Sequence, residues 1–493
     1  MTEPVSFGRR LSMLAGEHPE RDAIIFVPVE GEEERVSWRT LDRRSNQVAN
    51  LLAERGVDED SRVVVGMPNI PAHFILTYAA WKLGALVIPI RSNLPARERD
   101  QLLEVAEPTV VIAPWGGEIG HPVVSREELE SSYDYDDSPM PDVVPHPGKS
   151  VCSGGSTGRP KIIVDPRPWA FVPGQAARTG VGMRLGQIQL LAGPLYHNSP
   201  FTWSHMGLFE DHTLVLFEKF DAARVVNAIE RHRVNFGFLA PTMMQRIIRL
   251  PEIEQRDFSS VEAFFHTAAP CPPWLKRAWI DLIGAEKLYE GFGATEAVGS
   301  CVIRGDEWLE HPGSLGRPVN CDLAILDEDW QPVPVGEVGE IFMRSHSSQP
   351  TYVYIGSDRA KTTPEGFVSV GDMGWVDDEG YLYLADRRTD LIITGGVNVY
   401  PAEVEAALSE HPGIGDVAVI GLPDEEWGKR VHAIVQPGEE LTVEELDAHC
   451  RERLSSHKVP KSWEFVDSLP RDEAGKLRRS ALVAGRVPAE IQP

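Results

Sequence analysis

The sequence has few cysteines and no long apolar run. Its five cysteines are scattered over 493 residues, and no two of them form a CxxC pair. An odd, dispersed set argues against a disulfide framework and against a zinc site, and is typical of free thiols in a reducing compartment. Because no run of about 18 apolar residues occurs, we expect no membrane span.

Basic charge is also scarce. Lys and Arg number 48 against 74 Asp and Glu, so the formal net charge is −26. Such a chain repels phosphodiester backbones, and we expect no nucleic-acid partner. A small phosphate ligand can still bind through local donors and a metal ion. Residues 1–10 lack the apolar core of a signal peptide, so we expect a cytoplasmic protein.

The length requires two or more domains. Helix-like segments at residues 37–55 and 72–83 alternate with strand-like segments at 61–66, 85–90 and 109–113. This alternation predicts layered α/β structure with largely parallel strands. The polar, Pro-rich stretch at residues 127–149 is typical of an exposed connection.

The pattern changes in the last third of the chain. Between residues 319 and 344, short apolar runs separated by Gly, Pro and Asp predict hairpins, which could close into a small distorted barrel. After Asp386, a strand at 391–394, a helix at 401–411 and a strand at 416–421 predict a smaller α+β domain.

The strongest local motif is SGGSTGRPK at residues 153–161. Its glycines and hydroxyl residues leave backbone N–H groups and side-chain donors free to surround phosphate oxygens. It is not a Walker A loop, which needs Lys followed by Ser or Thr at the start of a helix. Here Lys161 follows Pro160 and precedes a strand at residues 162–164.

A second motif is GFGATE at residues 291–296. Its glycines let the backbone approach a ligand closely, Phe292 offers a flat face for a base, and Glu296 is a hard oxygen ligand for Mg²⁺. Taken alone, a turn that ends in a surface Glu is the more common explanation.

Two weaker motifs follow. Asp372 and Arg387 are a carboxylate and a guanidinium suited to ribose hydroxyls and a phosphate, although each alone is more typical of a surface ion pair. The segment PRDEAGK at residues 470–476 places Lys476 beside a glycine near the end of the chain. Such a lysine is usually solvated.

Together and in this order, these motifs resemble the superfamily of AMP-forming acyl-CoA synthetases, adenylation domains and luciferases, over nearly the whole chain. Residues 194–198 (PLYHN) match its gate segment and residues 267–270 (TAAP) its adenine-binding wall. Residues 423–437 are more similar to bacterial CoA ligases than to carrier-loading domains. The Gly155-Ser156 variant of the loop resembles that of bile-acid and other bulky-acid CoA ligases.

The resemblance implies an α/β fold with two domains. Residues 1–387 would form an adenylation domain of layered α/β subdomains with a small distorted β-barrel, and residues 388–493 a mobile α+β lid that turns about a hinge at Thr389. The family commonly has Asp or Lys at this hinge. Rotation is still expected, because a hinge needs two backbone states rather than a particular charge.

The implied reaction joins a carboxylic acid to ATP, releases pyrophosphate and passes the acyl group to coenzyme A. The catalytic residues would be Lys476, Thr295, Glu296 and His197, with Glu296 also holding Mg²⁺. The nucleotide would be contacted by Ser153, Gly154, Gly155, Ser156, Thr157, Gly158, Lys161, Thr267, Ala268, Ala269, Glu290, Gly291, Phe292, Gly293, Asp372, Leu384 and Arg387.

For the thiol step, the resemblance implies a tunnel for the pantetheine arm, with Gly395, Gly396 and Trp427 along it and His197 moving aside. His457 stands where the family often has an aromatic residue. The acid would lie among His197, Phe201, Phe238, Ala268, Gly291, Gly293 and Val298. Small residues on one wall and aromatic residues on another favour an aryl or polycyclic acid.

Three rival interpretations remain. The acceptor could be a phosphopantetheinyl carrier protein, although the segment around Trp427 argues mildly against it. The activated oxyanion could be another one, such as nitrite in a diazotising enzyme. A binding or structural protein with an inactive site is disfavoured, because the chain combines the five residues Lys161, Glu296, Asp372, Arg387 and Lys476. The sequence leaves open whether the chain is a monomer or a homodimer.

Overall fold

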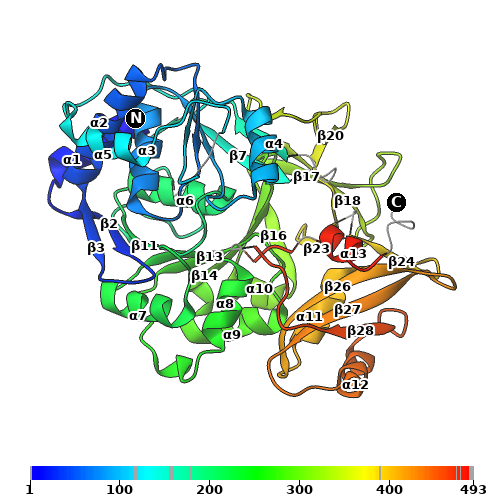
Figure 1. Cartoon of the computed structure of the whole chain (residues 1–493). Helices are drawn as coiled ribbons and strands as arrows, with labels where there is room; N and C mark the ends of the chain where they lie inside the picture. Colours follow the sequence, from blue (N-terminus) through cyan, green and yellow to red (C-terminus); the bar gives the residue numbers. More distant parts are fainter. Residues whose placement is uncertain are drawn as a thin grey trace.

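A computed structural model describes residues 3–115, 119–154, 160–176, 180–387, 390–472, 475–477 and 479–487. Figure 1 shows a large lobe that contains the first three quarters of the chain and a smaller lobe, in orange and red, built from its end. This division agrees with the expected α/β architecture of a large N-terminal and a small C-terminal part.

One sheet of the large lobe carries the strand that follows the glycine-rich loop. Its strand order is β19-β8-β7-β5-β4-β6. The strands are β4 (Arg62–Val65), β5 (Leu86–Pro89), β6 (Val110–Ile112), β7 (Lys149–Gly154), β8 (Pro160–Asp165) and β19 (Val353–Ile355). The first three are parallel, whereas β7 and β8 form an antiparallel hairpin around the loop.

Helices of the N-terminal region pack around these strands. They are α1 (Phe7–Glu17), α2 (Trp38–Glu54), α3 (Pro71–Lys82), α4 (Ala96–Ala106) and α5 (Arg126–Ser131). Local sequence explains their starts: the Ser37 side chain accepts the Thr40 N–H and caps α2, and Pro71 opens α3. The two predicted helices at 37–55 and 72–83 are therefore confirmed.

The second, larger sheet has fifteen strands within the described residues. Its main path is β20-β21-β18-β22-β23-β16-β15-β14-β13-β12-β10-β11-β2-β3, and β17 pairs with β18. The parallel half comprises β2 (Asp22–Val27), β10 (Ile188–Leu191), β11 (Thr213–Phe217), β12 (Phe236–Leu239), β13 (Ala263–His266) and β14 (Leu288–Gly293), with β3 (Glu34–Ser37) added antiparallel at the edge. Its helices are α6 (Asn198–Phe209), α7 (Ala222–His232), α8 (Pro241–Ile248) and α9 (Pro273–Ile283).

The antiparallel half contains the predicted hairpins. Its strands are β15 (Ser300–Arg304), β16 (Ser314–Val319), β17 (Cys321–Leu326), β18 (Gly339–Ser345), β20 (Lys361–Thr362), β21 (Val368–Ser369), β22 (Asp372–Val376) and β23 (Leu382–Arg387), with α10 (Gly305–Glu310) after β15. These strands continue the large sheet, and within the described ranges they do not close into a barrel. A separate two-stranded ribbon joins β1 (Val5–Ser6) to β9 (Ala170–Phe171).

The small lobe has its own sheet and core. It contains β24 (Ile392–Thr394), β25 (Val397–Val399), β26 (Ile414–Asp424), β27 (Gly428–Pro437) and β28 (Ser462–Phe465), with α11 (Pro401–Ser409), α12 (Val443–Arg453) and α13 (Arg479–Ala484). Its core is mainly aliphatic and includes the fully buried side chains of Val404, Val419, Ala433 and Leu446.

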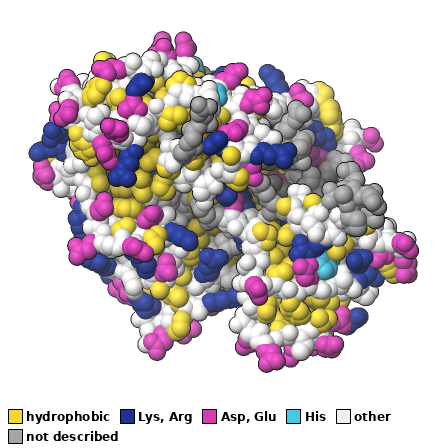
Figure 2. Space-filling model, in the orientation of Figure 1, with side chains coloured by type: hydrophobic (Ala, Val, Ile, Leu, Met, Phe, Trp, Pro, Cys, Tyr) yellow, Lys and Arg dark blue, Asp and Glu magenta, His cyan; other side chains and the backbone are white. Residues whose placement is uncertain are grey.

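Arg249 and Trp274 of the large lobe bind the small lobe through hydrogen bonds. Both terminal nitrogens of Arg249 donate to backbone carbonyls, that of Gly415 at 2.8 Å and that of Ile414 at 2.8 Å. Trp274 Nε1 donates to Ser409 Oγ at 3.2 Å. Figure 2 shows acidic side chains dispersed over the visible face of both lobes. All five cysteines are free thiols, and no helix in the described ranges is long and apolar enough to cross a bilayer.

Candidate active site

The predicted motifs meet at one edge of the large sheet. Strands β10, β12, β13 and β14 are parallel, so their carboxyl ends lie side by side. The gate segment follows β10, Thr242 follows β12, the segment 267–270 follows β13, and Glu296 follows β14. Ligands of open α/β sheets bind at this edge. The topology therefore brings four separate segments to one place.

Glu296 lies in the tight turn between β14 and β15. The turn is closed by the Ala297 N–H donating to the Ala294 carbonyl at 3.0 Å, and the Glu296 residue is only 6% exposed. Its Oε1 lies 3.4 Å from Lys161 Nζ and accepts the Tyr354 hydroxyl at 2.5 Å. The phosphate-loop lysine and the metal-binding candidate thus come together.

Most of the phosphate loop lies outside the described residues. Backbone pairing in the hairpin sets Ser153 opposite Lys161 and Gly154 opposite Pro160. Gly155, Ser156, Thr157 and Gly158, which the sequence assigned to phosphate binding, belong to the part of the loop that the structure leaves out. Thr295 is half-buried beside Glu296.

His197 stands at the start of α6, facing the small lobe. Its Nε2 lies 3.3 Å from Asp472 Oδ2, and its ring lies 4.5 Å from that of Tyr196. Burial lowers the pKa of His197; the Asp472 contact opposes that effect, whereas Lys476 and Arg91 add to it. The imidazole is therefore kept neutral at pH 7 and can rotate without moving a charge.

The catalytic-lysine segment is docked on the large lobe. Gly475 has φ +78°, and a Cβ there would lie 2.1 Å from Thr242 Oγ1, so only glycine permits this approach. Arg471 anchors the segment by binding Asp416 at 2.6 Å. The Lys476 N–H donates to Asp472 Oδ1 at 2.8 Å. The side chain of Lys476 is solvent-exposed on this docked loop.

The adenine-wall segment begins directly after β13. Ala268 adopts φ +80°, a left-handed conformation that is strained for a residue with a Cβ. Thr267 and Ala269 beside it are half-buried. Strain of this kind is common where a backbone approaches a ligand, which is consistent with the predicted role of the segment.

The prediction for Glu290 needs correction. Its carboxylate turns into the core and binds Lys276 Nζ at 2.5 Å, and Lys276 is 0% exposed. Alternation along β14 places Glu290 on the opposite face from Gly291, because successive side chains point to opposite faces of a strand. Only its backbone is available to a nucleotide. Its side chain fixes the strand that carries Gly291, Phe292 and Gly293.

The two ribose candidates come from paired strands. Asp372 opens β22, is 8% exposed and stands opposite Arg387 in β23. Leu384 is on the same strand as Arg387. Pairing therefore places the carboxylate and the backbone of Arg387 together, while the Arg387 side chain lies outside what the structure describes.

Two predicted acid-pocket residues are core residues instead. Phe201 is 0% exposed, with its ring 4.3 Å from His205 and 6.0 Å from Trp81. Val298 is buried in a different cluster that includes Met343. Phe201 is buried because its position on α6 points its side chain into the core. Val298 is buried because the turn after Glu296 directs it into the other cluster.

Of the other candidates, Phe238 and Gly291 both lie near Phe265 of β13. Phe238 stands opposite Phe265 in the register of β12 and β13, with ring centroids 6.0 Å apart. Trp203 of α6 packs 5.4 Å from Phe265. A Cβ on Gly291 would lie 2.5 Å from Phe265, so the glycine makes room for that ring. The sequence missed Phe265 and Trp203 because neither belongs to a motif.

The predicted tunnel residues Gly395, Gly396 and Trp427 are exposed. Gly395 and Gly396 form the turn between β24 and β25, and a Cβ on Gly396 would meet nothing within 4 Å. The Gly395 N–H donates to the Trp427 carbonyl at 2.9 Å. Lys461 Nζ lies 3.7 Å from the centre of the Trp427 ring. The hinge candidate Thr389 lies outside the described residues.

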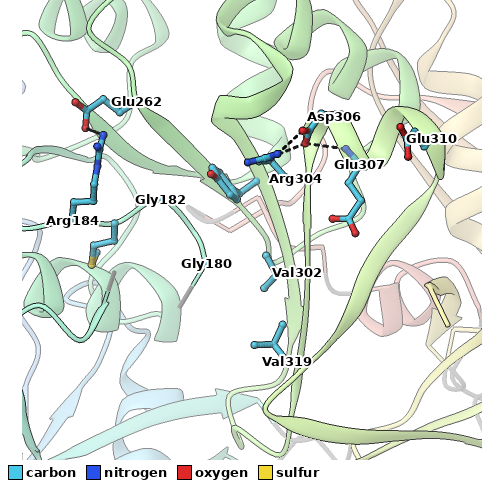
Figure 3. Close-up of a pocket in the computed structure, with 12 residues that line it drawn as sticks. Gly180, Gly182, Arg184, Glu262, Val302, Arg304, Asp306, Glu307, Glu310 and Val319 are labelled. Atoms are coloured by element: carbon cyan, nitrogen blue, oxygen red, sulfur yellow. Dashed lines mark hydrogen bonds and ion pairs between the residues drawn. The ribbon is translucent and has the colours of Figure 1, made fainter. Parts of the chain in front are cut away.

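A cavity of about 860 Å³ opens elsewhere, beside β14 and β15. Its lining includes Tyr289, Val302 and Val319, and none of the predicted site residues. Figure 3 shows two ion pairs in its lining, Arg184 with Glu262 and Arg304 with Asp306, whereas the carboxylates of Glu307 and Glu310 are not paired with another residue drawn. We assign this cavity no part in the chemistry of the sheet edge.

Two further residues, Asn69 and Tyr354, hold site segments in place, and neither belongs to a sequence motif. Buried Asn69 holds the gate segment: its Nδ2 donates to the Gly193 carbonyl at 2.8 Å, and its Oδ1 accepts the Leu195 N–H at 2.9 Å. Tyr354 binds Glu296 as described above. The alternating tyrosines at 352 and 354 were a visible signal, but only strand pairing places one of them at the carboxylate.

The donor set at Glu296 fits a magnesium ion that arrives with its substrate. Within the described residues, no three His, Cys, Asp or Glu side chains cluster as an all-protein metal site would require. Mg²⁺ commonly binds through one or two carboxylates, several waters and substrate phosphates. A single buried carboxylate beside Lys161 suits such a shared ion and does not suit a resident one.

Comparison with known proteins identifies the family. The family model of the AMP-binding enzyme matches residues 12–353, and that of the AMP-binding enzyme C-terminal domain matches residues 403–476. The chain belongs to the AMP-binding enzyme family, and the resemblance inferred from its motifs is confirmed.

Similar proteins cover nearly the whole chain. It is 30% identical over 488 residues to the 2-succinylbenzoate–CoA ligase of Bacillus pumilus (strain SAFR-032), covering 94% of this chain and 95% of that one. It is 33% identical over 458 residues to a feruloyl-CoA synthase of Amycolatopsis sp, covering 90% and 92%.

Among solved structures, the chain is similar to o-succinylbenzoate CoA synthetase from Bacillus subtilis. In complex with its acyl-adenylate intermediate, that protein superposes with a TM-score of 0.81 at 25% identity, over 98% of each chain. It has also been solved with ATP and a magnesium ion, at a TM-score of 0.80 and 25% identity, over 97% of this chain and 99% of that one.

Proposed function

We propose that this chain is an ATP-dependent, AMP-forming acid–CoA ligase. The observation that carries the proposal is the convergence at one sheet edge of Lys161, Glu296, the gate His197 and the docked loop of Lys476. Four segments far apart in the sequence meet there: three bear a cation or a carboxylate suited to adenylation, and His197 is suited to gate the thiol step. Family membership supports the same reaction.

In the first half-reaction, a carboxylate oxygen of the acid attacks the α-phosphorus of ATP. The bond from that phosphorus to the bridging oxygen breaks, and pyrophosphate leaves with the electron pair. Negative charge is redistributed over the phosphates, so the need is for electrostatic stabilisation by fixed donors and cations. No general base is needed, because the acid is already ionised at neutral pH.

The residues divide this work. Lys161 and the backbone of its loop hold the outer phosphates, and Thr295 donates to a phosphate oxygen. Glu296 holds Mg²⁺, which supplies positive charge to the phosphates when bound. Lys476 brings a compact ammonium charge to the carboxylate and α-phosphate. Asp372 binds the ribose.

In the second half-reaction, the thiol of coenzyme A attacks the acyl carbon and AMP leaves. The small lobe turns about Thr389, withdraws Lys476 and presents Gly395 and Gly396 as the wall of the pantetheine tunnel. His197 rotates out of the path. Its lowered pKa supports this role, since a buried neutral ring moves at less cost than a buried charged one.

The acid is proposed to be aromatic. Phe238, Phe265 and Trp203 form a largely buried surface of tilted aromatic rings next to the site, and Gly291 leaves room for the Phe265 ring. Offset stacking and edge-to-face contacts favour an aryl ring over a linear chain at such a surface. The two relatives are named for succinylbenzoate and ferulate, and both of these acids are aromatic.

We also propose the domain limits and setting of the enzyme. Residues 1–387 form the adenylation domain and residues 388–493 the mobile lid, with the boundary at the end of β23. The enzyme is proposed to act in the cytoplasm, as a monomer or homodimer.

The test is a pyrophosphate-release screen over aromatic and aliphatic acids, with Mg²⁺-ATP, each run with and without coenzyme A. We expect AMP and pyrophosphate with a bulky aromatic acid, and a thioester only when coenzyme A is present. Stoichiometric ADP and phosphate would refute the assignment. Pyrophosphate release with nitrite and an amine, or transfer only to a carrier protein, would replace the acid–CoA assignment by one of its rivals.

A further inference from the structure

Tyr354 lies at the centre of the phosphate and metal candidates although no motif contains it. It sits in β19, which pairs with β8 so that Tyr354 stands opposite Ile163, two positions after Lys161. Its hydroxyl donates to Glu296 Oε1 at 2.5 Å. Its ring centre lies 3.9 Å from Lys161 Nζ. One side chain therefore contacts both the carboxylate and the lysine.

The three groups form a closed cluster. Lys161 Nζ is itself 3.4 Å from Glu296 Oε1, so every member touches the other two. The described contacts of Glu296 all fall on Oε1, and the side chain is only 7% exposed. A buried carboxylate needs such partners, because an unpaired charge in this position is costly.

The cluster changes when a nucleotide enters. If Lys161 turns toward the phosphates, its ion pair with Glu296 is lost, and the carboxylate has to be held by something else. A cation over an aromatic face is attracted by the ring at modest energy, so Lys161 can leave Tyr354 readily. The hydroxyl of Tyr354 stays, because its strand is paired to β8.

We propose that Tyr354 is a positioning residue for nucleotide binding, which rests on the proposed function. Its hydroxyl fixes Glu296 in the rotamer that would face Mg²⁺. Its ring binds the Lys161 ammonium group while no nucleotide is bound.

A purely structural role makes a different prediction. Were Tyr354 only a strand residue that fills space, removing its hydroxyl would leave magnesium-dependent binding unchanged. Tyr352 provides the matched control: it lies on the same segment, its ring centre is 5.0 Å from that of Tyr354, and its hydroxyl has no bond to Glu296 among the described contacts.

The experiment is calorimetric titration of the full chain with ATP, once with Mg²⁺ and once with EDTA, on wild type, Tyr354→Phe, Tyr354→Leu and Tyr352→Phe. For Tyr354→Phe we expect Mg²⁺-ATP affinity to fall about 10-fold, the loss of one hydrogen bond to a charged group, while affinity in EDTA changes less than about 2-fold. Tyr354→Leu should also weaken binding in EDTA, since Lys161 loses the ring. Tyr352→Phe should match wild type.

Steady-state kinetics then separate positioning from catalysis. Tyr354→Phe should raise KM for Mg²⁺-ATP about 10-fold and change kcat little, and excess Mg²⁺ should restore most of the loss. Equal Mg²⁺-ATP affinity of wild type and Tyr354→Phe would overturn the inference, as would equal losses with and without Mg²⁺. A wild-type chain that binds no Mg²⁺-ATP at all would instead overturn the proposed function, and the inference with it.

Discussion

Two glycine-containing loops of the small lobe differ in their environment: one packs on the large lobe and the other faces solvent. The loop of Lys476 is packed on the large lobe, where Gly475 touches Thr242. In the turn of Gly395 and Gly396, Gly395 lies against the Trp427 ring, but a Cβ on Gly396 would meet nothing within 4 Å, and the neighbours Ile393 and Val397 are 52% and 43% exposed. All three glycines have positive φ, so backbone chemistry alone does not separate the loops.

The difference lies in which face of the lobe is docked. Arg249 and Trp274 hold the small lobe so that the lysine face meets the gate and the tunnel face meets solvent. We interpret this arrangement as the state for adenylation, with a turned state for thioester formation. Each prediction below perturbs one face and asks whether one half-reaction alone responds.

The largest effect is expected from Lys476→Ala. Removing the ammonium charge from the docked face should slow adenylate formation by about 100-fold or more, roughly 3 kcal/mol in the transition state. Thioester formation from a supplied acyl-adenylate should stay near normal. Single-turnover kinetics of both steps measure this, with Lys458→Ala, whose native side chain binds Glu403, as the control. Equal slowing of both steps would rule out the two-state arrangement.

Gly396→Phe should have the opposite effect, slowing the second half-reaction and sparing the first. The side chain meets nothing in the docked state but would fill the tunnel after rotation, so thioester formation should fall about 10- to 100-fold while adenylation persists. Gly380→Phe is matched for backbone strain, with φ +82° and open space, and should affect neither step. Loss of adenylation in Gly396→Phe would show that this face is not confined to the second step.

Glu296→Gln tests the large lobe, which does not turn in the proposed cycle. An amide oxygen is a poorer ligand for a hard cation than a carboxylate, so half-maximal adenylation should need about 10-fold more Mg²⁺. Transfer from supplied acyl-adenylate to coenzyme A should not change. Titration of Mg²⁺ in the pyrophosphate assay gives the result, and an unaltered Mg²⁺ dependence would remove Glu296 from the metal site.

Arg249→Ala should weaken docking without touching either set of reacting groups. Its two hydrogen bonds to the small lobe exist in the docked state, so their loss should slow adenylation about 5-fold and leave thioester formation equal or faster. Trp274→Phe removes a single bond at the same interface and should have a smaller effect of the same sign. Uniform slowing of both steps would mean that Arg249 stabilises the fold as a whole and does not favour the docked orientation of the small lobe.

The smallest effect is expected from Asp472→Asn. Although burial opposes ionisation, the contacts with His197 and the Lys476 backbone lower the pKa of Asp472 in the docked state. An ionised Asp472 therefore favours docking above its ordinary pKa of about 3.9, and this contribution disappears as pH falls through the docked-state pKa. Between about pH 6 and 9 the variant should slow adenylation by a constant factor of about 2 to 3. A loss that varied across this range would point to another titrating group.

Much of the local structure could be predicted from the sequence. The helices α2 and α3 follow from apolar periodicity together with Ser37 and Pro71, which mark their starts. The strand after Lys161 and the hairpin of β17 and β18 follow from short apolar runs between turn residues. The sequence also singled out Lys161, Glu296 and His197, because their types and order match a family, and their roles stay predictions.

Orientation was harder to predict than identity. Glu290 and Phe201 belong to the right segments, yet strand alternation turns Glu290 toward Lys276, and helical phase turns Phe201 into the core. A sequence motif marks a stretch of chain and does not say which way each side chain points. The predicted barrel likewise became an open continuation of the sheet within the described ranges, since hairpin patterns do not encode closure.

By itself, the sequence determined the family, the half-reaction chemistry and the elements that bear each group, because these depend on residue type and local spacing. Only the tertiary structure decided which groups meet. The parallel order of β10, β12, β13 and β14 gathers four segments at one edge. Pairing of β19 with β8 brings Tyr354 to Glu296, and docking of the small lobe selects the lysine face over the tunnel face. These contacts join segments that lie far apart along the chain, and no local pattern records them.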